Sequence, residues 1–272
     1  MTDPGETFRA LHRPGDPFIL ANAWDAGSAR MLAAIGAQAL ATSSAAHAFT
    51  LGLPDGSVTR DQALAHAQDL VAATSLPVQG DFEDGWGEDP DTVAETVRLS
   101  AEIGLAGICI EDVPGPGGDS YSRDLAIQRI VAGAAAARAL PRDFVFCARA
   151  DGVMTGAYDL DEAVARLRAF DESGADVLYV PMPGDLAALG RVVAATRKPV
   201  NALAAGPLAS HRLDEFAKIG VARVSLGSAL ARVTHGAIAR CAHAMFSDGD
   251  FTDLTTAMPG ADVEALLRAG GA

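Results

Sequence analysis

The sequence predicts a single (β/α)8 barrel, an α/β fold in which eight parallel strands alternate with helices. Eight short apolar runs recur along the 272 residues, and most are followed by an amphipathic, alanine-rich stretch. The runs are continuously apolar, which is typical of parallel strands covered on both faces. Their spacing, mostly about 20–40 residues, is that of one strand–helix unit. The predicted strands are residues 18–24, 39–44, 78–84, 107–112, 144–151, 177–182, 199–203 and 223–226.

Helix signals fill the gaps between these strands. Four polar residues each precede a helical stretch and can accept a hydrogen bond from its first turn. Glycines followed by a small or apolar residue then end helices before the next strand. The predicted N-caps are Asp25, Thr59, Asp89 (with Pro90 at the first helical position) and Asp159, and the predicted C-cap glycines are Gly36, Gly104, Gly174 and Gly220.

An open, doubly wound sheet is the alternative fold. It normally has fewer strands and a glycine-rich dinucleotide turn, and no GxGxxG follows the first strand here. We therefore expect residues 1–272 to form one barrel domain. Within it, residues 229–272 hold the last barrel helix, which ends near residue 247, a polar turn and one short helix.

Composition excludes several classes of function. The formal net charge is −14, which opposes binding to nucleic acid or to an anionic membrane surface. No apolar stretch approaches the ~18 residues of a membrane span, and the first residues lack a signal-peptide pattern. Three cysteines without a CxxC pair indicate a reduced chain. We expect a cytoplasmic enzyme that binds a small molecule.

Acidic residues gather where the chemistry of a barrel takes place, at the carboxyl ends of the strands. Asp81 and Glu83 share one face of strand three by the period-two rule, Glu111 ends strand four and Arg149 ends strand five. If these faces point inward, three carboxylates converge and repel unless a cation lies among them. Oxygen ligands alone favour Mg²⁺, with Mn²⁺ as the alternative.

Each of these residues also has a structural interpretation. A carboxylate at a strand end can be only the N-cap of the next helix, and Arg149 can neutralise a carboxylate or bind a substrate carboxylate with its planar fork. His47, in the loop after strand two, can reach the site or lie at the surface. The turn of residues 225–228 can bind phosphate or simply pack closely.

The two lysines exclude imine chemistry at the site. A Schiff base in a barrel needs a lysine at the carboxyl end of a strand. Lys198 precedes strand seven, at the opposite end, and Lys218 lies in a helix.

Several phrases together resemble the isocitrate lyase/phosphoenolpyruvate mutase superfamily. They are NAWDAGSARMLAAIG, ATSSAA, LGLPDG, GDFEDGWG, GICIEDV, FCARAD, PVNALA and GVARVSLG, and they span about residues 8–245. The resemblance implies a Mg²⁺-dependent enzyme that acts on a 2-oxo acid or its enolate. It also implies a tetramer in which the eighth helix is exchanged between paired subunits.

The resemblance also implies roles for individual residues. Asp81 is similar to the direct metal ligand, with a water-mediated shell around it, and Arg149 is similar to the substrate arginine. Ser43 and the backbone after it, Ser44 and Ala45, resemble the cradle of the substrate carboxylate. The implied shell is Asp55, Glu83 and Glu111, and Asn201 resembles a further polar contact.

The loop after strand four departs from the family. Lyase members carry a Lys-x-Cys-Gly-His loop with an acid/base cysteine, whereas residues 113–124 read VPGPGGDSYSRD. The loop with lysine and asparagine of the mutase and phosphonopyruvate hydrolase members is also missing. Decarboxylation of an oxaloacetate-type substrate needs an electron sink but no strong base, so it suits this loop best. Tyr121, Ser120 or solvent would deliver the proton, and His47 or Tyr121 would be the base in a lyase reaction on a larger 2-hydroxy acid.

Three alternatives stay open from the sequence. The first is an enzyme that cleaves the P–C bond of a phosphonopyruvate-type substrate. The second is a weakly catalytic protein that binds 2-oxo dicarboxylates. The third is a metal-independent barrel that handles phosphate at the turn after strand eight.

Overall fold

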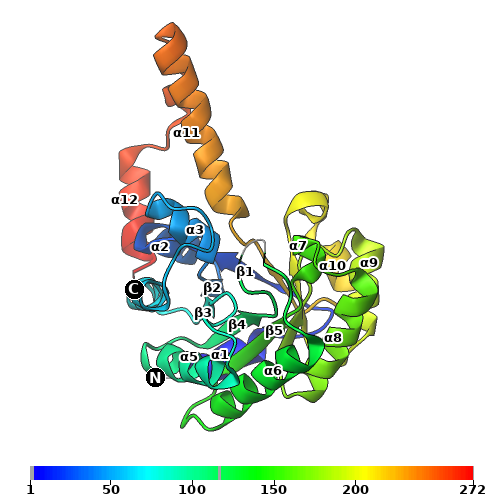
Figure 1. Cartoon of the computed structure of the whole chain (residues 1–272). Coiled ribbons are helices and arrows are strands. Elements are labelled where there is room, and N and C mark those ends of the chain that lie inside the picture. The colour runs from blue at the N-terminus through cyan, green and yellow to red at the C-terminus, as the bar shows by residue number, and fades with distance from the viewer. Residues whose placement is uncertain (1–2, 116–117, 272) are drawn as a thin grey trace.

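The computed structural model describes residues 3–115 and 118–271 and confirms the (β/α)8 barrel. Eight parallel strands pair in sequence order, and the last pairs with the first to close the barrel (Figure 1). Several strands are shorter than predicted, because their polar ends turn into the loops. The strands are β1 Phe18–Asn22, β2 Ala39–Ala41, β3 Val78–Asp81, β4 Gly107–Glu111, β5 Val145–Arg149, β6 Val177–Tyr179, β7 Val200–Leu203 and β8 Arg223–Ser225.

The helices begin where the capping residues predicted. The Asp25 carboxylate accepts from Ser28 N at 2.6 Å, and Thr59, Asp89 and Asp159 cap their helices in the same manner. The helices are α1 Pro4–Leu11, α2 Ala26–Ile35, α3 Ser44–Thr50, α4 Arg60–Ala73, α5 Pro90–Glu102, α6 Arg123–Arg138, α7 Gly152–Thr155, α8 Leu160–Glu172, α9 Leu186–Ala194, α10 Leu213–Lys218, α11 Ala229–Asp248 and α12 Gly260–Ala269, with 3-10 turns η1 Gly206–Ser210 and η2 Thr252–Thr256.

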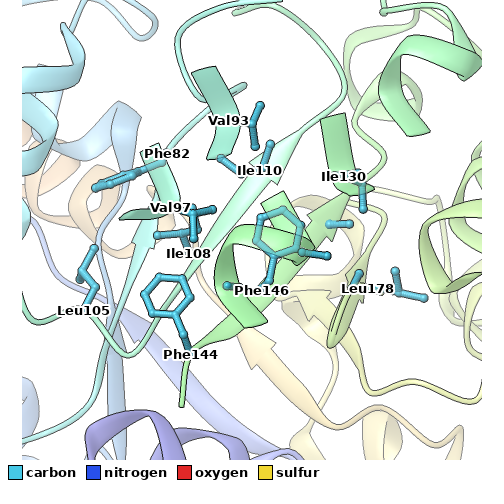
Figure 2. Close-up of a cluster of buried hydrophobic side chains, with 14 of the residues drawn as sticks. Phe82, Val93, Val97, Leu105, Ile108, Ile110, Ile130, Phe144, Phe146 and Leu178 are labelled. Carbon is cyan, nitrogen blue, oxygen red and sulfur yellow. The ribbon is translucent and has the colours of Figure 1, made fainter. Parts of the chain in front are cut away.

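The main apolar core lies between the barrel and its helices. Figure 2 shows Ile108, Ile110 and Phe146 of the strands meeting Val93 and Val97 of α5, all fully buried. α6 approaches this layer closely because it carries Gly133. A Cβ there would lie 2.4 Å from the Phe146 ring. The outward faces of the strands are thus apolar, and the inward faces carry a second apolar cluster together with buried polar residues.

A polar network fills the amino-terminal end of the barrel interior. Arg223 is 1% exposed and donates to Gln79 Oε1 at 2.6 Å and to Asn201 Oδ1 at 2.9 Å. Its guanidinium also lies 3.3 Å from Cys147 Sγ and 3.0 Å from His12 Nε2. Among the described residues no carboxylate pairs with Arg223. His12 must therefore stay neutral to accept from it, with its own proton on the Nδ1 that faces Phe8 O.

This network predicts how acid destabilises the protein. Burial, and then the charge of Arg223, lower the pKa of His12 from 6.5 to about 3. Between pH 6.5 and about 3, His12 binds a proton in the unfolded chain but not in the folded protein. The free energy of unfolding therefore falls as the pH falls through this range. The advantage of the parent over His12→Gln should shrink by about 1.4 kcal/mol per pH unit below 6.5. Urea unfolding of both proteins at pH 5, 6.5 and 8 measures this, and a constant difference would refute it.

The carboxyl-terminal segment leaves the barrel. α11 projects away from the body, and α12 returns to pack beside α2 (Figure 1). α11 exposes Val233, Ile238 and Phe246, which are 66%, 64% and 86% accessible. On the outer face of β1, Ile19 is 48% accessible, although strand residues at such positions are normally covered. Within residues 3–115 and 118–271, no helix combines the length and apolar character needed to cross a membrane.

Candidate active site

A cavity of about 500 Å³ opens at the carboxyl ends of the strands, where a barrel holds its reactive groups. It brings together eight of the eleven residues that the sequence singled out. The other three, His47, Tyr121 and Asn201, do not line it. The eight are Ser43, Ser44, Ala45, Asp55, Asp81, Glu83, Glu111 and Arg149.

Asp81 is oriented by the turn that joins β2 to α3. Its backbone N–H donates to Thr42 Oγ1 at 2.7 Å. Its Oδ2 accepts from Ser44 N at 3.0 Å and from Ser44 Oγ at 3.1 Å. Ser43 is the N-cap of α3, so the predicted strand ends early and its serines begin a short helix. These bonds to Oδ2 leave Asp81 Oδ1 to face the cavity.

Glu83 reaches the cavity from a loop and does not continue β3 as predicted. The strand ends at Asp81, and Glu83 has a φ of 45°, in the left-handed region that is unfavourable for a non-glycine residue. Its side chain is 8% exposed, and Oε1 has no hydrogen-bond partner among the described residues. Burial, and then the charges of Asp81 and Asp55, raise the pKa of Glu83 to about 7.

Arg149 lies among the carboxylates. Its Nη1 is 2.8 Å from Glu111 Oε1 and 3.7 Å from Asp81 Oδ1, and its Nε donates to Asp151 Oδ1 at 2.5 Å. Cross-strand pairing places Glu111 directly opposite Arg149. The arginine thus neutralises part of the cluster. Within the described part of the chain no side chain bonds its Nη2, which leaves one edge of the fork for a ligand.

The carboxylates fit a hydrated dication better than a fully protein-coordinated one. Among the described residues no group of three or more acidic or histidine side chains converges on one point as a ready metal cage. Asp81 with water-mediated neighbours still suits Mg²⁺, which keeps several of its waters. Two observations support a cation site. Glu83 Oε1 has no hydrogen-bond partner among the described residues. Burial is the first cause of the raised pKa values of Glu83 and Glu111, and a bound cation would stabilise the charged form of both carboxylates.

His47 is a buried residue of α3 and not part of a surface loop. Its ring stacks on His66 at 3.8 Å, and the two rings line a separate cavity of about 10 Å³ behind Glu83. Burial lowers the pKa of His47, so the ring is neutral near pH 7. The structure therefore gives His47 no direct contact with a ligand in the main cavity.

Tyr121 and Asn201 are also occupied elsewhere. The Tyr121 hydroxyl donates to Asp84 Oδ2 at 2.6 Å, and burial followed by this bond raises the pKa of Tyr121, which weakens it as an acid. Asn201 donates to Ser225 Oγ at 2.8 Å in the network below the cavity floor. The polar contact with a ligand that the resemblance implied for Asn201 is therefore not available, because its side chain bonds Ser225 and Arg223 instead.

Two N–H groups of the turn after β8 are not free to bind phosphate. Leu226 N and Gly227 N both donate to Asn22 Oδ1 at 2.9 Å. The side-chain amide of Asn22, in β1, thus occupies two of the donors that a phosphate would need. This disfavours the phosphate-handling alternative.

Sequence reasoning missed the far half of the cavity. Arg232 of α11 lines it, and Asp151 lines it beside Arg149. Asp151 could have been found, because it follows Arg149 by two residues and the period of a strand places both on one face. Arg232 carried no signal beyond its place in the first turns of the last helix. The rest of this half is apolar, formed by Met154, Met182, Leu203, Ala205 and Leu226.

Several known proteins are similar to this chain in sequence and in fold. The family model for phosphoenolpyruvate phosphomutase matches residues 8–246. An uncharacterised protein of Mycobacterium tuberculosis is 34% identical over 266 residues, 96% of either chain. The 2-methylisocitrate lyase of Escherichia coli is 32% identical over 74% of this chain and 70% of its own. A Burkholderia cenocepacia structure of proposed lyase or mutase activity superposes with a TM-score of 0.91 at 48% identity, covering 96% of this chain and 94% of that one. This chain therefore belongs to the phosphoenolpyruvate phosphomutase family, within the isocitrate lyase/PEP mutase superfamily of lyases and mutases.

Proposed function

We propose that the protein is a Mg²⁺-dependent carbon–carbon lyase that decarboxylates an oxaloacetate-type 2-oxo acid through an enolate. The observation that carries the proposal is the convergence of Asp81, Glu83, Glu111 and Arg149 on one cavity. Asp81 would hold the metal directly, and Asp55, Glu83 and Glu111 would hold its water shell. When bound, Mg²⁺ would stabilise the negative charge that develops on the enolate oxygen.

The chain's own groups would hold the substrate at its two ends. The free edge of Arg149 suits the carboxylate next to the 2-oxo group. The first turn of α3 adds the Ala45 N–H, because Ser44 N donates to Asp81 and Ala46 N to Ser43 Oγ. Arg232 also lines the cavity and would attract a doubly charged, dicarboxylic substrate toward it.

The bond that breaks would lie beside the apolar half of the cavity. Loss of CO₂ transfers the electron pair of the C3–C4 bond to the 2-oxo oxygen, and C3 then takes up a proton. Low polarity around Met154, Met182 and Leu226 favours departure of neutral CO₂ from a charged carboxylate. Because the Tyr121 hydroxyl is bound to Asp84, we assign the final proton to solvent and not to Tyr121.

A substrate screen tests this proposal. Oxaloacetate, 2-methylisocitrate, 2,3-dimethylmalate and phosphonopyruvate should each be incubated with the protein and Mg²⁺, and again with chelator. We expect pyruvate and CO₂ from oxaloacetate, faster than with Mg²⁺ alone and abolished by chelator. Inorganic phosphate from phosphonopyruvate would instead establish the P–C alternative. Mg²⁺-dependent oxalate binding without turnover of any substrate would establish the binding protein.

We also propose that the protein is a homo-oligomer in which α11 of one copy covers the exposed outer face of β1 in another. The exposed Ile19 and the apolar side chains of the projecting α11 support this arrangement, because one copy alone leaves both in water. Paired dimers of this kind would form the tetramer.

Light scattering after size-exclusion chromatography tests the assembly. The parent should elute as a dimer or larger, whereas Ile238→Glu should elute at a lower mass, because a charge in a buried apolar contact costs several kcal/mol. Val131→Glu, which changes an exposed apolar residue of α6, is the matched control and should keep the parent mass. A monomeric parent at micromolar concentration would contradict the proposal.

A further inference from the structure

Asp112, at the end of β4, is the centre of a buried three-residue cluster. Its Oδ2 accepts from the Tyr158 hydroxyl at 2.7 Å and from Arg166 Nη1 at 3.0 Å. The Arg166 guanidinium lies 4.6 Å from the Tyr158 ring centre, within range of a cation–π contact. Asp112 is 2% exposed and Arg166 is 5% exposed, so the bond between them is buried, whereas Tyr158 is half-buried.

The preceding strand–helix unit contains the same arrangement. Asp84, after β3, accepts from the Tyr121 hydroxyl at 2.6 Å and lies 3.9 Å from Arg129. The Arg129 guanidinium lies 4.2 Å from the Tyr121 ring centre. In both units the arginine follows the tyrosine by eight residues and lies on the next helix. The chain therefore provides two chemically matched clusters.

Within the described part of the chain, the Asp112 side chain, unlike that of Asp84, is linked by hydrogen bonds to Arg149 of the candidate active site. Asp112 Oδ1 accepts from Asp151 N at 2.8 Å, and Asp151 Oδ1 accepts from Arg149 Nε at 2.5 Å. In the other cluster, Asp84 Oδ1 accepts from Trp86 N, in the loop after β3. Hydrogen bonds thus run without a break from the Tyr158 hydroxyl to the Arg149 guanidinium. Among the described residues, the hydrogen bonds of the Tyr121 hydroxyl lead only to Asp84 and Trp86 N, and Tyr121 reaches Asp112 through its backbone N–H alone.

We propose that Tyr158 is a positioning residue that fixes Arg149 through Asp112 and Asp151. The Asp151 side chain makes no cap bond at the start of α7. Its backbone is held at the carbonyl by Met154 N and Thr155 N and at the N–H by Asp112 Oδ1. The Tyr158 ring also supports this turn from below, since a Cβ on Gly152 would lie 2.2 Å from it. Loss of the hydroxyl lets Asp112 turn toward Arg166, which loosens Asp151 and with it the Nε side of Arg149.

Chemical labelling of Arg149 tests the proposal without reference to any substrate. Phenylglyoxal modifies accessible guanidinium groups, and peptide mass spectrometry measures the rate at each arginine. Arg149 should react several-fold faster in Tyr158→Phe than in the parent. Tyr121→Phe, which loses the matched bond to Asp84, should leave the Arg149 rate at the parent value. Equal Arg149 rates in folded Tyr158→Phe and parent would overturn the proposal. If Tyr158→Phe does not fold, Asp112→Asn takes its place under the same criterion.

Calorimetric binding of oxalate in the presence of Mg²⁺ tests whether Tyr158 also affects ligand binding by Arg149. This test rests on the proposed function. Tyr158→Phe should weaken oxalate binding about tenfold, but should weaken it little further in an Arg149→Lys background, because both changes act on one group. Additive losses would show that Tyr158 acts by another route. In a further outcome, the parent protein fails to bind oxalate while Arg149 is still labelled faster in Tyr158→Phe. That result would refute the proposed function and leave the positioning role of Tyr158 established.

Discussion

Asp81→Asn should lose at least about a thousandfold in kcat/KM for the Mg²⁺-dependent reaction, roughly 4 kcal/mol of transition-state stabilisation. An amide is a poor ligand for a hard dication compared with a carboxylate. The fold should persist, because an Asn oxygen still accepts from Ser44 N and Ser44 Oγ. Without metal the variant should melt no lower than the parent, since Asp81 contributes to the repulsion that raises the pKa values of Glu83 and Asp55.

Three measurements establish whether the loss belongs to the metal. Steady-state rates across Mg²⁺ concentrations, Mn²⁺ binding by electron paramagnetic resonance, and thermal unfolding should be compared between the parent and Asp81→Asn. Asp89→Asn removes a carboxylate outside the cavity while keeping the helix cap, so it should match the parent in all three. Parental Mn²⁺ affinity and turnover in Asp81→Asn would exclude Asp81 as the ligand.

Arg149→Lys should lower kcat/KM by about a hundredfold, roughly 3 kcal/mol, while the protein stays folded. A lysine keeps the positive charge that Glu111 and Asp151 require, but its single ammonium cannot bond Asp151 and a substrate carboxylate at the same time. Arg149→Ala should instead also lower the melting temperature, because it leaves two buried carboxylates unpaired, at a cost of about 3–5 kcal/mol.

The comparison of these two variants separates binding from folding. Steady-state kinetics and calorimetry with oxalate measure the ligand, and thermal unfolding measures the fold. If Arg149→Lys binds oxalate and turns over substrate like the parent, Arg149 only neutralises the carboxylates. The structure shows the neutralising contacts, since three contacts of Arg149 are internal, and the edge of its fork that the described residues leave unused is the one proposed to bind the substrate.

The regular parts of the barrel could be predicted from the sequence because they depend on local patterns. Asp25 and Asp159 cap helices by bonds to residues three positions away, and the strand runs are apolar on both faces. The predicted ends of the second and third strands were wrong for one reason. Strand propensity does not show where pairing with the neighbouring strand stops. Ser43 therefore became a helix cap, and Glu83 entered the left-handed region.

The sequence predicted which strand ends carry the residues of the site. It did not predict which side-chain contacts those residues make. Asp81, Glu111 and Arg149 follow from the period of two and the closure of the barrel. The partner of Tyr121 lies 37 residues away and that of Asn201 lies 24 residues away, on other units, so only three-dimensional packing decides whether a polar group faces a ligand or another side chain. Arg232 joins the cavity because α11 begins shortly after β8, at the end of the barrel where the cavity opens.

The loop of residues 113–120 is anchored at both ends. Asp112 precedes it and is held by Tyr158 and Arg166, while Tyr121 follows it, donates its backbone N–H to Asp112 O at 3.0 Å and is held by Asp84. Because this stem is closed independently of what lies between, lengthening the insert costs mainly closure entropy, about 0.6 kcal/mol for each doubling. Evolution, or a protein engineer, can thus exchange the whole segment as a unit while Asp112 and Tyr121 keep their contacts at its two ends.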